Sequence, residues 1–173
     1  SGTNHTGYIT SNGDLYVMGD NEFGQLGVTG ETVILDPTLL AHNVAKVAIG
    51  EAHTMYLTTS GNLYVLGRGV EGQLGLGEDT LNHYAPVLIG EGIVDIAAGN
   101  YSSYFVTREG ILYAFGANGM GQLGDGTMTT RRSPVQIATG VRKVVSQVDH
   151  ALYLTSTGTL FGMGRNANYQ LGD

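Results

Sequence analysis

A four-residue segment, Gly-Gln-Leu-Gly, returns along this chain at an almost constant interval. It occurs at 24–27, 72–75 and 121–124, and a Tyr-Gln-Leu-Gly variant fills 169–172. Its glutamines are therefore 48, 49 and 48 residues apart, at Gln25, Gln73, Gln122 and Gln170. A fixed period of this length is typical of repeat architectures, in which each unit buries its apolar faces against its neighbours.

Other landmarks keep the same interval. The chain has three prolines, Pro37, Pro86 and Pro134, and they lie in register with the repeated segment. Counted from these prolines, whole units cover 37–85 and 86–133, a unit truncated at its end covers 134–173, and residues 1–36 supply a partial unit. We therefore predict a single repeat domain over 1–173 with about three and a half units.

Each unit predicts four short strands and no helix. In residues 86–115, a short outer strand begins at Pro86, because proline is tolerated at strand starts and edges. Apolar runs at 93–98, 103–107 and 111–115 follow, and Arg108-Glu109-Gly110 forms a hairpin loop with glycine at its left-handed position. The 28 glycines fit a chain with many tight turns. Four-stranded sheets at this period predict an all-β fold of β-propeller blades.

The most regular copy, GILYAFGANGMGQLG at 110–124, resembles the repeat signature of the regulator of chromosome condensation (RCC1) family. Residues 48–53 and 123–127 fit the same signature, and the resemblance covers essentially the whole chain. It implies blades of a seven-bladed propeller. It also implies a binding module: the family's best-known member is a guanine-nucleotide exchange factor for a small GTPase and binds nucleosomes, while other members inhibit enzymes or belong to ubiquitin ligases.

Three and a half units are half of such a ring. We expect either a fragment of a longer propeller, which we favour, or two copies that close a ring. Open blade edges and apolar end faces would in both cases favour self-association.

Charge and composition exclude several classes of function. The net charge is −7; residues 1–100 hold eleven acidic and two basic residues, and residues 101–173 hold four acidic and six basic residues. This distribution disfavours nucleic-acid binding, which needs a concentrated basic face. The chain has no cysteine, and no apolar run approaches the ~20 residues that span a membrane. We expect a soluble domain, with no signal peptide visible at Ser1; its compartment stays open.

The polar side chains that recur in the repeats are better explained by structural roles than by catalysis. Histidines share one repeat position, with Ser102 in the remaining copy: His5, His53 and His150. A ring of imidazoles around an axis would suit a metal. The better interpretation is a structural role beside a strand start, where the imidazole can bond backbone groups of the adjacent loop. The four glutamines are likewise predicted to satisfy loop backbone groups. No nucleophile elbow or phosphate-binding loop is present, so we predict no catalytic residues, no metal, no cofactor and no enzyme.

Residues that differ between repeat copies are better candidates for a partner surface, because the scaffold does not dictate them. Tyrosine is also favoured at interface hot spots. The candidates are Phe23, Tyr84, Tyr101, Tyr104, Met120, Arg131, Arg132 and Tyr169. The sequence thus predicts a protein-binding module that uses variable rim loops. A microbial surface module that binds glycans or the cell envelope, and exchange activity on a small GTPase, remain the alternatives.

Overall fold

The computed structural model describes residues 2–172, which form fourteen β-strands and no helix. The all-β expectation is confirmed. The strands are β1 (His5–Ile9), β2 (Leu15–Asp20), β3 (Val33–Ala41), β4 (Val44–Ile49), β5 (His53–Thr58), β6 (Leu63–Gly67), β7 (His83–Gly90), β8 (Ile93–Ala98), β9 (Ser102–Thr107), β10 (Leu112–Gly116), β11 (Arg131–Ala138), β12 (Val141–Gln147), β13 (His150–Thr155) and β14 (Leu160–Gly164). These residues include no helix long and apolar enough to cross a bilayer.

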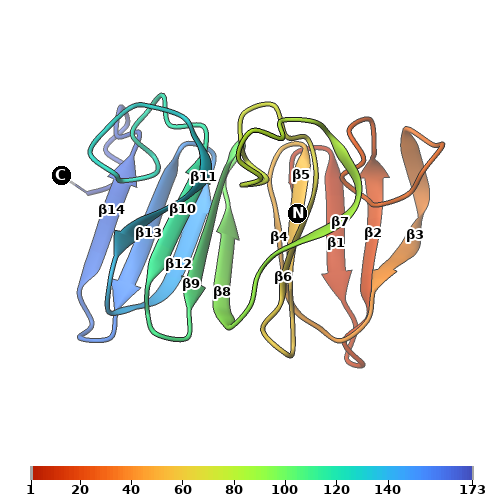
Figure 1. The fold of residues 1–173 in the computed structure, drawn as a ribbon, viewed down its shortest axis with the longest axis horizontal. Coiled ribbons are helices and arrows are strands. Elements are labelled where there is room, and N and C mark those ends of the chain that lie inside the picture. Colours follow the sequence, from red (N-terminus) through yellow and green to blue (C-terminus); the bar gives the residue numbers. More distant parts are fainter. Residues whose placement is uncertain (1, 173) are drawn as a thin grey trace.

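The strands make four antiparallel sheets that stand side by side like consecutive propeller blades (Figure 1). Their orders are β1-β2-β3, β4-β5-β6-β7, β8-β9-β10-β11 and β12-β13-β14. Sheets 1 to 4 are numbered here in chain order. Three and a half sequence units therefore yield two four-stranded and two three-stranded sheets. Within residues 2–172, sheet 1 has no counterpart of β4 and sheet 4 has no counterpart of β7.

The hairpins between the two middle strands of each sheet form as expected from their glycines. Gly13, Gly61, Gly110 and Gly158 have φ angles of 84°, 91°, 80° and 87°. That left-handed region penalises any residue with a β-carbon, so glycine recurs there in every copy.

The proline strands differ from the prediction in two ways. Pro86 is the fourth residue of β7 rather than its first, and it lies in a bulge where four residues of β7 span the two-residue step from Val65 to Gly67. The bulge on an outer edge strand accommodates a residue that cannot donate a ladder hydrogen bond. In addition, β7 pairs with β6, which precedes it, so the first strand of each sequence unit completes the sheet of the unit before it.

Apolar side chains fill the three spaces between sheets. Each sheet carries a stacked aromatic pair, and on sheets 2 to 4 this pair faces the preceding sheet. Tyr56 and Tyr64, for example, have ring centroids 5.1 Å apart. The sheet-facing leucines of the Gly-Gln-Leu-Gly segments, Leu26, Leu74 and Leu123, are at most 1% exposed. On the outer faces of sheets 1 and 4, by contrast, Tyr8 and Leu160 are 42% and 62% exposed. Self-association through these faces stays a prediction, which sedimentation analysis of the chain would test.

Candidate functional site

The long loops that follow β2, β6, β10 and β14 gather at one end of the sheets, together with the short turns β4–β5, β8–β9 and β12–β13 (Figure 1). We call this end the loop rim. The hairpin turns form the opposite rim. Each long loop is organised by its repeat glutamine, whose Oε1 accepts the backbone N–H two residues earlier. The donors are Phe23, Glu71, Met120 and Asn168, at 2.9–3.0 Å.

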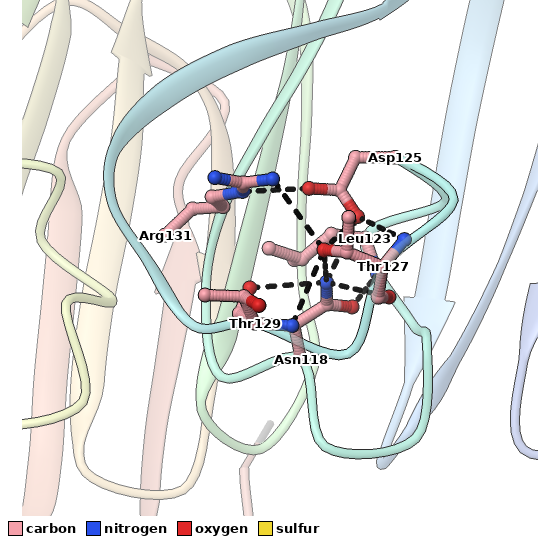
Figure 2. A network of polar contacts seen from close by, with 6 residues as sticks. All are labelled: Asn118, Leu123, Asp125, Thr127, Thr129 and Arg131. Carbon is pink, nitrogen blue, oxygen red and sulfur yellow. Dashed lines mark hydrogen bonds and ion pairs between the residues drawn. The ribbon is translucent and has the colours of Figure 1, made fainter.

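A buried asparagine closes the loop between β10 and β11 (Figure 2). Asn118 is fully buried; its Oδ1 accepts the Leu123 N–H at 3.0 Å. Its Nδ2 lies 3.0 Å from Asp125 Oδ1 and from the Thr127 carbonyl, and 3.1 Å from the Thr129 carbonyl. One amide thus ties distant points of the loop together.

The same loop holds Arg131, a residue predicted to contact a partner. Its Nε donates to Asp125 Oδ2 at 2.6 Å. Although burial alone would raise the pKa of Asp125, hydrogen bonds from Arg131 and Thr127 lower that pKa to about 2. The Arg131 guanidinium is therefore committed to an internal ion pair, which argues for a structural role.

The repeat histidines join neighbouring sheets through buried hydroxyl groups. His5 Nε2 lies 3.0 Å from Thr54 Oγ1, which donates to the Gln25 carbonyl at 2.7 Å. In the next interface, His53 Nε2 lies 2.9 Å from Ser103 Oγ, which donates to the Gln73 carbonyl at 2.7 Å. The sequence interpretation placed backbone groups of the adjacent loop opposite these rings; the structure places hydroxyls of the next sheet there.

This geometry fixes the protonation of both imidazoles. Each hydroxyl gives its one proton to a carbonyl, so Nε2 must carry the hydrogen that joins ring and hydroxyl. Burial lowers the pKa of His5 to about 4 and that of His53 to about 3. Both rings are neutral at pH 7. Within residues 2–172, no group of three histidine or carboxylate side chains is placed to hold a metal ion.

The third repeat histidine, His150, does not join this pattern, because it lies on β13 in sheet 4 and no further sheet follows within residues 2–172 to offer a hydroxyl. A β-carbon on Gly50 would lie 2.1 Å from Cε1 of His53, so the buried ring needs glycine at that position. The corresponding residue of the last repeat is Gln147, which ends β12 and pairs with His150. His150 is partly exposed.

In the third interface, between sheets 3 and 4, a tyrosine replaces the hydrogen-bonded chain of histidine, hydroxyl and carbonyl. Ala151 takes the place of Thr54 and Ser103 there and offers no hydroxyl. Tyr104 supplies one instead: its Oη donates to the Gln122 carbonyl at 2.8 Å and lies 3.2 Å from Ser102 Oγ. Tyr104 is 0% exposed, so its assignment to a partner surface was wrong. Tyr104 differs from the residues at this position in the other copies because its hydroxyl replaces the one that Ala151 lacks.

Replacing Tyr104 with phenylalanine should lower the free energy of unfolding by about 1–3 kcal/mol, because the Gln122 carbonyl loses a buried donor. Adding Ala151→Ser should recover part of this loss by restoring the hydroxyl that the other interfaces use. Urea unfolding of both variants checks this. Ala151→Ser alone, with Tyr104 intact, should give no gain; an equal gain in both backgrounds would contradict the compensation.

Two predicted candidates meet around an arginine on the loop rim. The Arg68 guanidinium carbon lies 5.0 Å from the ring centroid of Phe23 and 5.9 Å from that of Tyr101, both within cation–π range. Glu71 accepts from Arg68 Nε at 2.9 Å and from Nη2 at 2.7 Å. This two-point pairing holds the guanidinium in one orientation.

Gln73 supports that arrangement by donating to Glu71 Oε2 at 2.9 Å. Burial alone would raise the pKa of Glu71, but the hydrogen bonds from Arg68 and Gln73 lower it. The pKa of Tyr101 is raised by burial and then by a hydrogen bond to Glu51. Four loop segments therefore form one half-buried polar and aromatic cluster.

The remaining candidates also lie at or near the loop rim. Tyr84 is 44% exposed, and its hydroxyl donates to the Glu22 carbonyl at 3.2 Å. Met120 and Tyr169 occupy loop tips and are 51% and 79% exposed. Tyr169 has a φ of 59° where the sister copies have glycine. Arg132 packs near Gly72, and its side chain is 53% exposed. We define the rim patch as Phe23, Arg68, Glu71, Tyr84 and Tyr101.

A family model described as "Regulator of chromosome condensation (RCC1) repeat" matches residues 12–57, 60–106 and 109–151, and a second model of the same description matches 44–73, 93–122 and 141–170. The chain belongs to the RCC1 repeat family. Its partial propeller of about three and a half units is the RCC1 architecture that the repeat signature implied.

Solved structures agree with this fold. Human WBSCR16 superposes with a TM-score of 0.86 at 24% identity, over 99% of this chain and 48% of its own. Prp20p from Saccharomyces cerevisiae gives 0.83 at 23% identity, over 99% and 45%. Yeast RCC1 (Prp20) bound to Kap60 gives 0.82 at 23%, over 99% and 44%. The chain thus spans just under half the length of these structures, and the likeness establishes the fold. A search of curated proteins found no match.

Proposed function

We propose that this RCC1 chain is a non-enzymatic protein-binding module whose partner contacts the loop rim. One observation carries this proposal: side chains that vary between repeats converge on that rim, and Phe23 and Tyr101 enclose Arg68 there. Aromatic residues are favoured at interface hot spots, and rings held around an arginine that Glu71 fixes in place lose little side-chain entropy on binding. Prp20p, whose structure was described with its binding to Gsp1p and histones, is a related propeller that binds proteins.

Site-specific photo-crosslinking in an extract of the source organism tests the rim. We expect a crosslinker at Glu22 or Met120 to form a covalent adduct with another protein. Matched crosslinkers at Glu109 and Thr157, on the opposite rim, should form none. Equal adducts from both rims would contradict the proposal.

Two further assays separate the alternatives. We expect the chain not to accelerate nucleotide release from a panel of small GTPases, and not to bind a glycan array. Accelerated release would establish exchange activity instead. A glycan signal without any rim-dependent protein adduct would favour a surface or adhesion module.

A further inference from the structure

The loop rim carries an excess of negative charge. This excess is confined to the first two long loops and to the turn between β4 and β5. These segments, residues 20–32, 50–52 and 68–82, contain seven carboxylates and one permanently charged base, Arg68. The carboxylates are Asp20, Glu22, Glu31, Glu51, Glu71, Glu78 and Asp79. Glu22, Glu51 and Glu71 of this set lie at the rim patch.

The single arginine does not make the patch an anion site. Both carboxylate oxygens of Glu71 accept hydrogen bonds from Arg68, at 2.9 and 2.7 Å. An incoming carboxylate or phosphate would have to displace Glu71 and would be repelled by Glu22 and Glu51. Arg68 instead contacts the rings of Phe23 and Tyr101 and holds them in place.

The rings and acids together suit a positively charged chain. Phe23, Tyr84 and Tyr101 offer partly exposed aromatic surface, and Tyr84 is joined to the first loop by its bond to the Glu22 carbonyl. Long cationic side chains can lay their aliphatic stems on such rings while the head groups reach carboxylates. The exposed carboxylate of Glu22 and the half-buried one of Glu51 are on this rim.

We propose that the partner docks on the rim patch through a segment rich in arginine or lysine. This inference rests on the proposed function and names the chemistry of its partner. Charge complementarity selects this partner, because the same rim in residues 102–172 carries a mixed set of charges: Asp125 and Asp149 against Arg131, Arg132 and Arg165.

Fluorescence anisotropy with two defined probes tests the proposal. The first probe is a labelled twelve-residue peptide with four arginines in a glycine–serine background; the second has four glutamates instead. We expect the arginine peptide to bind, to bind more weakly as salt is raised, and to lose about tenfold in affinity with Glu22→Gln/Glu51→Gln or with Tyr101→Ala. The matched control, Glu91→Gln/Glu109→Gln on the opposite rim, should bind as the unmodified chain does.

Four outcomes overturn the inference. The control variant weakens binding as much as the patch variants do, which would mean attraction to net charge alone. Tyr101→Ala binds unchanged, or the glutamate peptide binds more tightly. Finally, neither peptide binds while crosslinks from Glu22 and Met120 to a protein persist; the proposed function then stands and only the partner chemistry fails. Loss of those crosslinks as well would remove both proposals.

Discussion

Acidifying the folded chain from pH 7.5 to pH 5 is expected to lower its free energy of unfolding by about 4 kcal/mol. The effect comes from His5 and His53, whose pKa values burial lowers to about 4 and about 3. An unfolded chain binds protons at histidine near pH 6.5, while these two folded rings do not. Stability from the neutral rings is therefore full above pH 6.5 and is lost as the pH falls toward 4 and then 3.

Urea unfolding at half-unit pH steps measures this loss. His53→Gln keeps a side-chain N–H that can reach Ser103 but does not titrate, so it should remove about half of the pH dependence between 7.5 and 5. Asp125 and Glu71, with lowered pKa values, add their own losses below about pH 4.5. A profile for His53→Gln as steep as that of the unmodified chain would refute the assignment.

Removing the amide of Asn118 should cost about 3 kcal/mol, because Asn118→Ala leaves buried loop groups without their partners. The Leu123 N–H and the carbonyls of Thr127 and Thr129 lose their shared contact. Asn21→Ala should cost somewhat less, because Asn21 joins two carbonyls and one N–H and has no carboxylate partner. Thermal unfolding and limited proteolysis of the 117–130 loop measure both effects.

An exposed asparagine provides the control. Asn168→Ala removes a side chain at a loop tip and should change stability by less than about 0.5 kcal/mol. Comparable losses for Asn168→Ala and Asn118→Ala would show that the amide network contributes little. Unchanged proteolysis of the 117–130 loop in Asn118→Ala would show the same.

The repeat period was enough to predict the strands, the hairpin glycines and the family. It could not predict which strands share a sheet. Two residues separate β7 from β8 and fifteen separate it from β6, yet β7 pairs with β6, so packing rather than proximity in sequence decides. Nor could variation between copies alone separate Tyr101 from Tyr104. One lies on the rim, and the other replaces a hydroxyl that Ala151 lacks. Comparing Ala151 with Thr54 and Ser103 was the signal that would have found the second role.

The charged members of the candidate site were missed for a related reason. Arg68 varies between copies just as Phe23 does, with Asp20, Ala117 and Arg165 at the same position. The same criterion would therefore have selected it. Its contact with rings from two other segments, however, depends on the curvature of the sheets, which no local pattern records.

The offset between sequence units and sheets has a consequence for a chain that is cut. A nick in the 117–130 loop would separate two polypeptides that still share a sheet, because β11 of the second piece pairs with β10 of the first. A nick at residues 139–140, between β11 and β12, would leave no strand of either piece in a sheet of the other. The long loops are thus the places where this protein can be split into two parts that find each other again by completing a β-sheet.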